Sequence, residues 1–124
     1  MAAAAELARS VDARLLLVSV VPPYVFPIDV PSGVPGDMIA RHVEYAEGLL
    51  AKSKVAVEAM RVPAETKLLV GSPAPLIAEL AEGRADVDLV VVGRTGAGLV
   101  ARALVGSTAD RIVHSCHKPV LVIP

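Results

Sequence analysis

The chain has 124 residues, of which 54% are hydrophobic and 20% charged, and its formal net charge is -1. This length accommodates one domain, and this apolar content excludes an intrinsically disordered chain. The balance of acidic and basic residues argues against a nucleic-acid partner, which normally needs a basic excess. With no Trp, one Phe and two Tyr, the core is expected to consist of Val, Leu, Ile and Ala.

The single cysteine, Cys116, excludes an internal disulfide framework and a multi-cysteine zinc site. The longest apolar runs are far shorter than the roughly 18 residues that suggest a membrane span. The Ala-rich start carries Glu6 and no positive leading segment, unlike a signal peptide. These features predict a cytoplasmic protein with no membrane contact.

The first half of the chain predicts a helix, a strand and a long helix. Strong helix formers in the first ten residues predict a helix that ends near Asp12. Arg14–Val21 is typical of a strand covered on both faces. Prolines and glycines over Pro22–Gly36 predict a long exposed connection. Asp37 is then expected to cap an amphipathic helix that ends near Met60.

That long helix has two distinct faces in the sequence. Its apolar face is expected to hold Ile39, Val43, Ala46, Leu50 and Val57. Its charged residues, Arg41, Glu44, Lys52 and Glu58, fall largely elsewhere, which is typical of a surface helix.

The second half alternates strands and helices. A turn with Ser72 as cap and Pro73 at the first helical position predicts a helix that presents Leu76, Ile77 and Leu80 inward. Strands alternating with helices indicate an α/β fold with a doubly wound parallel sheet. The expected elements are strand Thr66–Val70, helix Pro73–Glu82, strand Asp88–Val92, loop Gly93–Gly106, helix Ser107–Ser115 and strand Pro119–Ile123.

The glycine-rich loop joins a buried strand to a helix start. Glycines allow backbone amides to approach a ligand closely, and a helix N-terminus adds free N–H groups and a partial positive charge. Together these predict a phosphate-binding cradle. Leu99 and Val100 stand where a P-loop needs Lys and Ser or Thr. The dinucleotide fingerprint also fails, because no acidic residue lies about 20 positions further on.

The spacing Gly93-x2-Gly96-x9-Gly106-Ser107 resembles the ATP-binding signature of the universal stress protein family. Nearly the whole chain shares in the resemblance, including ELARSVDARLLLVSVVPP, GSPAPLIAELAEGRADVDLVVVGRTG and GSTADRIVHSCHKPVLVIP. The resemblance implies a single domain over residues 1–124 with a five-stranded parallel sheet of order 3-2-1-4-5.

The resemblance also implies a ligand and a partner. Family members of the nucleotide-binding class hold ATP, often with a divalent ion such as Mg or Mn. Val20 would lie near adenine, and the other site residues implied are Gly93, Arg94, Gly96, Gly106, Ser107 and Thr108. The closing strand, Val120–Ile123, would pair across a two-fold axis and form a homodimer.

The chain departs from the family at its start. The family begins with a strand and an acidic turn that contacts the nucleotide, and no such segment precedes Met1. We therefore expect a Rossmann-like domain truncated at its N-terminus, without the first, central strand. The true start lies upstream, the chain is a fragment, or the neighbouring strands pair directly.

Several residues have a structural interpretation beside the functional one. Ser107-x-x-Asp110 forms a capping box, which by itself accounts for both residues. Arg94 and Arg102 could neutralise phosphate, although loop arginines are usually solvated. Cys116 is expected to pack as a small core residue. His114 and His117 are typical of a solvated helix end, where histidine suits the dipole.

These observations favour an ATP-binding regulatory protein of the stress response that acts by binding and dimerisation rather than by turnover. Backbone amides and a helix dipole hold phosphate but supply no general base. One alternative is a slow ATP hydrolase, with Asp110 as the local candidate for an acid or base. Another is a dimeric interaction module without a ligand. The sequence supports no catalytic residue and no metal site formed by protein side chains.

Overall fold

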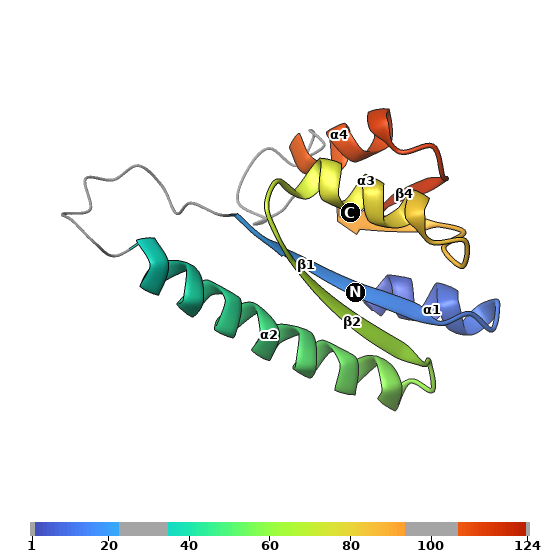
Figure 1. Cartoon of the computed structure of the whole chain (residues 1–124). Helices are drawn as coiled ribbons and strands as arrows, with labels where there is room; N and C mark the ends of the chain where they lie inside the picture. Colours follow the sequence, from blue (N-terminus) through green and yellow to red (C-terminus); the bar gives the residue numbers. More distant parts are fainter. Residues whose placement is uncertain (1, 23–34, 94–106, 124) are drawn as a thin grey trace. The chain divides into compact units, whose positions relative to one another are not determined.

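The computed structural model describes residues 2–22, 35–93 and 107–123. Helices and strands alternate along the chain, as the sequence predicts (Figure 1). The described residues fall into two compact units, an N-terminal unit, Met1–Ser72, and a C-terminal unit, Pro73–Pro124. The elements are α1 (Ala2–Ser10), β1 (Leu15–Val21), α2 (Pro35–Ala59), β2 (Ala64–Val70), α3 (Pro73–Gly83), β3 (Val90–Gly93), α4 (Ser107–Ser115) and β4 (Val120–Ile123).

The described strands form two parallel pairs. In the N-terminal unit β1 pairs with β2, and Leu15 lies opposite Ala64. In the C-terminal unit β3 pairs with β4, and Val90 lies opposite Val120. Parallel strands joined through helices confirm the α/β class. In the order 3-2-1-4-5 that the resemblance implies, β1 and β2 of this chain correspond to the family's second and third strands, and β3 and β4 to its fourth and fifth. The absence of the family's first strand stays a prediction.

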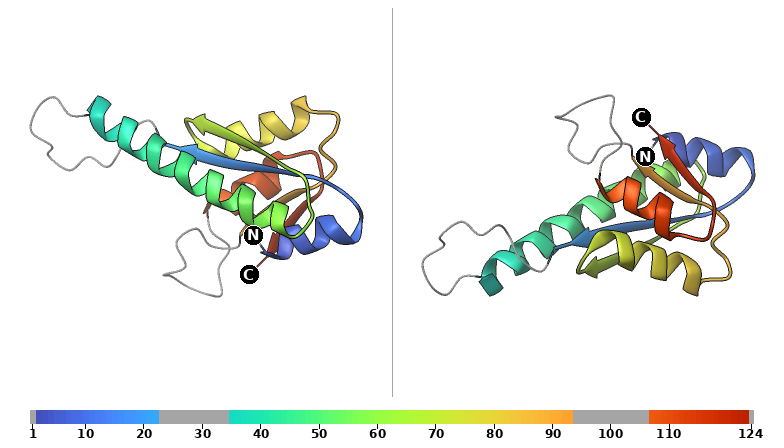
Figure 2. Two further views of the ribbon diagram at one scale, coloured as in Figure 1. Left: turned by 90° about the horizontal axis from the view of Figure 1, so that it is seen from below. Right: turned by 90° about the horizontal axis from the view of Figure 1, so that it is seen from above.

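The core of the N-terminal unit lies between the strand pair and its helices. Both α1 and α2 contribute to a cluster made of Ala5, Ala8, Val57 and Val62. The predicted inner face of α2 is confirmed, because its apolar residues are buried or half-buried and its four named charges are exposed. Figure 2 shows α2 running along the β1–β2 pair. The buried side chains of the described residues are Ala, Val and Ile, three of the four types that the composition predicts, whereas the described leucines are at most half-buried.

The start of α2 differs from the sequence prediction. The helix begins at Pro35, so Pro35 and Gly36 are not part of the connection and Asp37 is not the capping residue. Proline suits the first helical position, because its missing N–H would have no partner there and its φ is already helical. Residues 23–34 of the expected connection lie outside the described residues.

Both helices of the N-terminal unit end in the same backbone motif. After α2, Arg61 adopts a φ of 66°, its N–H donates to the Glu58 carbonyl, and the Val62 N–H donates to the Val57 carbonyl. After α1, Asp12 has a φ of 58° and the Ala13 N–H donates to the Ala8 carbonyl. These are Schellman motifs, in which a left-handed residue turns the chain and satisfies terminal carbonyls.

The C-terminal unit packs its helices through small residues. Figure 2 shows α3 and α4 side by side, and the two helices are in contact. The buried residues of α3 are Ala74, Ala78 and Ala81, whereas the leucines and isoleucine predicted to point inward are only half-buried. Alanine allows two helix backbones to approach closely, so the alanines occupy the contact. Ala109 and Ile112 of α4 are buried, and Ile112 is 0% exposed.

Candidate functional site

Three of the predicted phosphate-binding residues are placed in the C-terminal unit. Gly93 is the last residue of β3 and is exposed, Ser107 is the first residue of α4, and Thr108 follows it on the exposed surface. Arg94, Gly96 and Gly106 lie outside the described residues. The described part of the predicted cradle is therefore a strand end and a helix start.

The topology of this unit brings that strand end and helix start to one edge. Because β3 and β4 are parallel, their carboxyl ends, Gly93 and Ile123, lie side by side. The chain leaves β3 at this edge and must return along α4 to begin β4 at the other edge, so α4 starts near the carboxyl ends of both strands. The N–H groups of its first turn have no partner within the helix and carry partial positive charge. Such an edge favours an anion.

Val20 is described in the N-terminal unit. It lies in β1, opposite Leu69 of β2, and is half-buried. Its place one residue before the carboxyl end of β1 agrees with the predicted strand position. Of the predicted site residues that the structure describes, Gly93, Ser107 and Thr108 belong to the C-terminal unit and Val20 to the N-terminal unit.

Asp110 adds a negative charge to the first turn of α4. Its side chain is 59% exposed, and its carboxylate Oδ1 lies 3.5 Å from Nδ1 of His114, one turn further along the helix. The same ring nitrogen lies 2.8 Å from the Asp110 carbonyl oxygen. A protonated His114 would therefore offset part of the Asp110 charge beside the predicted anion site.

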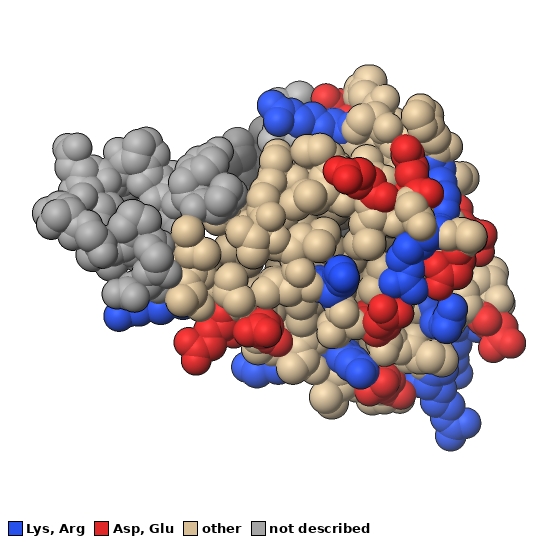
Figure 3. Space-filling view, viewed as in Figure 1, with Lys and Arg blue, Asp and Glu red and all other residues tan. Residues whose placement is uncertain are grey.

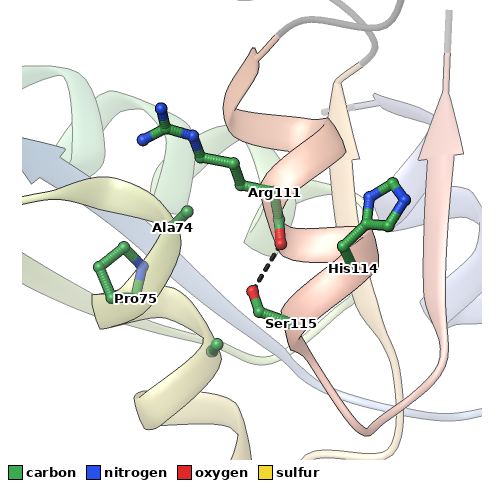
Figure 4. A pocket seen from close by; sticks show the side chains of 6 residues that line it. Ala74, Pro75, Arg111, His114 and Ser115 are labelled. Atoms are coloured by element: carbon green, nitrogen blue, oxygen red, sulfur yellow. Dashed lines mark hydrogen bonds between the residues drawn. The ribbon is translucent and has the colours of Figure 1, made fainter.

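A shallow groove lies between α3 and α4 (Figure 4). Its α3 side is formed by Ala74, Pro75 and Ala78, and its α4 side by Arg111, His114 and Ser115. The Ser115 hydroxyl donates to the Arg111 carbonyl, as Figure 4 shows. The exposed position of His114 confirms the solvated helix end that the sequence predicts. The groove is a separate feature from the helix start that holds Ser107 and Thr108.

A polar clasp that the sequence did not reveal joins the two helix–strand turns of this unit. The Glu82 carboxylate accepts a hydrogen bond from the backbone N–H of His117 at 2.9 Å and lies 3.1 Å from the His117 ring. The Lys118 ammonium donates to the carbonyls of Arg84 and Val87. We name Glu82, His117 and Lys118, with these two carbonyls, the polar clasp.

The clasp changes the acidity of its carboxylate. The backbone N–H of His117 stabilises the ionised form and lowers the pKa of Glu82 below its ordinary value, and the nearby His117 and Lys118 charges act in the same direction. Cys116, just before the clasp, is half-buried, and its N–H donates to the Ile112 carbonyl. Its partial burial agrees with the packing role that the sequence predicts.

Neither a membrane-spanning helix nor a metal-binding cluster is found among the described residues. In the ranges 2–22, 35–93 and 107–123, no helix is both long and apolar enough to span a membrane. The same ranges contain no group of three or more His, Cys, Asp or Glu side chains able to hold a metal ion.

Comparison with known proteins identifies relatives along the whole chain. A model described as the universal stress protein family matches residues 1–124. A universal stress protein of Methanocaldococcus jannaschii is 34% identical over 121 residues, which cover 97% of this chain and 70% of that relative. A universal stress protein of Mycobacterium tuberculosis is 33% identical over 85 residues, but the match covers only 30% of its length.

Solved structures share the fold. The universal stress protein UspA from Lactobacillus plantarum superimposes with a TM-score of 0.86 at 23% identity, covering 99% of this chain and 86% of that one. A universal stress protein from Archaeoglobus fulgidus in complex with dAMP has a TM-score of 0.63 at 22% identity, covering 98% and 82%. The family model matches the full length of this chain, and the parallel strand pairs and the helix order agree with that match. This chain therefore belongs to the universal stress protein family.

Proposed function

We propose that this chain binds an adenine nucleotide, ATP, with its phosphates at the N-terminus of α4, and that it regulates a stress response through this binding. The observation that carries the proposal is the position of Ser107 and Thr108 at a helix start on the carboxyl edge of a parallel strand pair. Such edges are where α/β sheets bind ligands. The Archaeoglobus fulgidus neighbour, solved in complex with dAMP, supports an adenine nucleotide as the ligand class.

The residues present fit a triphosphate. The first-turn N–H groups of α4 would donate to phosphate oxygens, and the exposed Thr108 hydroxyl would add a donor. Gly93, Gly96 and Gly106 would permit close backbone approach, and Arg94 would offset charge, on the evidence of their spacing alone. The adenine contact that the resemblance implies for Val20 stays a prediction. A Mg or Mn ion would arrive with the phosphates, whose oxygens it prefers.

The chemistry proposed is binding rather than turnover, because backbone amides and a helix dipole hold phosphate but supply no general base. Slow hydrolysis is the second candidate. It is favoured by one observation, an exposed carboxylate on Asp110 in the first turn of α4. Release of phosphate from ATP and Mg that is lost in Asp110→Asn, while ATP still binds, would support this candidate over binding alone.

The test of nucleotide binding is titration calorimetry of the 124-residue chain with ATP and magnesium. Gly106→Val should abolish saturable binding, and Thr108→Val should weaken it by about tenfold, the equivalent of one lost hydrogen bond to a charged group. Gly83→Val is the matched control, because the first added carbon there meets nothing within 4 Å. Absence of binding by the folded parent chain would reject the proposal and leave a ligand-free interaction module.

We also propose a homodimer through the open edge of β4, Val120–Ile123. The Val90 N–H donates to the Pro119 carbonyl. In a parallel ladder this register directs the backbone groups of Val120 and Val122 away from β3. A second copy could pair there across a two-fold axis. Leu121, which is 39% exposed, would then face the same region of the second copy.

The dimer is tested by sedimentation of Leu121→Lys beside Leu121→Thr. Like charges opposite one another destabilise strand pairing, whereas Thr keeps strand propensity. The lysine variant should be monomeric at concentrations at which the threonine variant is dimeric. Equal dimerisation of both variants would contradict the β4 interface.

A further inference from the structure

The outer face of α2 carries a second regular row of residues. Opposite the buried face, Tyr45 and Val55 are each 69% exposed, although both are large and apolar. A Cβ added at Gly48 would meet nothing within 4 Å. Along α2, the positions of Tyr45, Gly48, Lys52, Val55 and Ala59 are separated by alternating steps of three and four residues. We name Tyr45, Gly48, Lys52, Val55 and Ala59 the outer seam.

Spacing of this kind is the contact pattern of two helices packed along their length. Steps of three and four place all five residues in one stripe, like the a and d positions of a coiled coil. The stripe runs about 21 Å along the helix axis, at 1.5 Å per residue. The inner face of α2 already packs on β1 and β2, so the outer seam is a second packing face of the same helix.

The pairing of large with small side chains favours an antiparallel partner helix with the same sequence. In one antiparallel register, Tyr45 lies opposite Val55 of the second copy, and Gly48 lies opposite Lys52 of the second copy. Ala59 then lies opposite Arg41 of the second copy. Each long side chain therefore meets a smaller one, and the missing side chain of Gly48 leaves room for the lysine stem. A parallel register would instead place the two Lys52 ammonium groups against each other.

The charges beside the outer seam complement each other in that antiparallel register. Glu44 lies one turn before Gly48, within reach of Lys52 of the second copy, and Glu58 lies beside Ala59, next to Arg41 of the second copy. Figure 3 shows acidic and basic side chains along α2. Arg41, Glu44, Lys52 and Glu58 are all exposed, and none of them forms an ion pair with another described residue. Two-fold symmetry would form each pair twice.

We propose that α2 of this chain packs antiparallel against α2 of a second copy through the outer seam. This interface is distinct from the β4 edge, and it requires neither nucleotide nor the dimer proposed there. A chain with both interfaces would form assemblies larger than a dimer. A contact of this length is small, so the association is expected to be weak and concentration-dependent.

The register is tested by disulfide trapping in a Cys116→Ala background, which removes the only native thiol. Tyr45→Cys with Val55→Cys should cross-link at least about tenfold faster than either single variant. A disulfide needs Cβ atoms about 4 Å apart, whereas two copies of residue 45 would lie roughly 15 Å apart along the axis. Equal cross-linking of the single and double variants, or none in the double variant, would overturn the proposal.

A charge exchange tests the same interface without cysteine. It is measured by sedimentation in a Leu121→Lys background, so that pairing at β4 does not contribute. Lys52→Glu should weaken self-association about tenfold, because two attractions become repulsions. Adding Glu44→Lys should restore it. Failure of the second change to restore association, in a chain whose circular dichroism is unchanged, would overturn the proposal.

Discussion

The two units of this chain begin their strand pairs in the same way and close their turns in different ways. In the N-terminal unit the Leu15 N–H donates to the Pro63 carbonyl, and in the C-terminal unit the Val90 N–H donates to the Pro119 carbonyl, both at 2.9 Å. Each proline directly precedes the second strand of its pair, where a missing N–H costs no ladder bond. The ladders therefore have equivalent starts.

The turns that precede those strands are held by different kinds of hydrogen bond in the two units. In the N-terminal unit, left-handed residues after α1 and α2 satisfy terminal carbonyls with backbone hydrogen bonds, and Val62 then packs on Val57 in the core. In the C-terminal unit, Glu82 and Lys118 supply side-chain hydrogen bonds from one turn to the other. The strands of the C-terminal unit are shorter than those of the N-terminal unit, and their side chains are at most half-buried.

The largest effect is expected from a cavity in the C-terminal unit. Ile112→Ala should reduce the free energy of unfolding by about 2–5 kcal/mol, because Ile112 is fully buried and its truncation leaves a cavity. Ile112→Val should cost only about 0.5–1.5 kcal/mol. Urea unfolding measures both values. Hydrogen exchange would show α3, α4 and β3 losing protection first, and equal loss in the N-terminal unit would mean that the units unfold together.

Removal of the clasp lysine should have the next largest effect. Lys118→Met keeps the apolar stem but removes the ammonium that donates to the Arg84 and Val87 carbonyls, and the Arg84 carbonyl keeps the N–H of Val87 as a donor, at a cost of about 1–3 kcal/mol. Lys67→Met, at an exposed lysine of β2, is the matched control. If both variants unfold at the same urea concentration, the clasp does not stabilise the unit.

A smaller effect of opposite sign is expected at the end of α2. Arg61→Gly should stabilise the chain by about 0.5–1 kcal/mol, because glycine adopts the left-handed conformation without the Cβ clash that arginine has at a φ of 66°. Lys54→Gly, within α2, should instead destabilise by about 1 kcal/mol. Thermal unfolding distinguishes the two directions. Destabilisation by Arg61→Gly would show that the arginine side chain outweighs the strain.

The smallest effect is a change in pH dependence. The pKa of Glu82 is lower in the folded chain than in the unfolded chain, so its contribution is present above the ordinary glutamate pKa. That contribution is lost as the pH falls through the lowered value. The urea midpoint of the parent chain should therefore fall more steeply on acidification than that of Glu82→Gln. Glu79→Gln, at an exposed residue of the same helix, should behave like the parent.

Local patterns were sufficient for most elements. The bounds Ser107–Ser115 agree with α4, and the inner face of α2 follows from its apolar period. The start of α2 was misplaced, because a proline ends an extended segment and begins a helix equally well. The left-handed residues after α1 and α2 gave no signal either, since Asp and Arg stand where glycine is usual. Of the candidate site, sequence spacing supplied the residues, and the structure adds that Gly93 ends β3 and that Ser107 begins α4 in the same unit.

The sequence by itself determined the α/β class, the family and the helix start that is proposed to hold phosphate, because these depend on short-range periodicity, capping and glycine spacing. Only the tertiary structure decided which α3 residues are buried and which groups close the turns of the C-terminal unit. Glu82 meets His117 across 35 positions of the chain, and Lys118 reaches Arg84 across 34. No local pattern marks such pairs, because they arise only after α3 and α4 have packed through their alanines and placed both turns side by side.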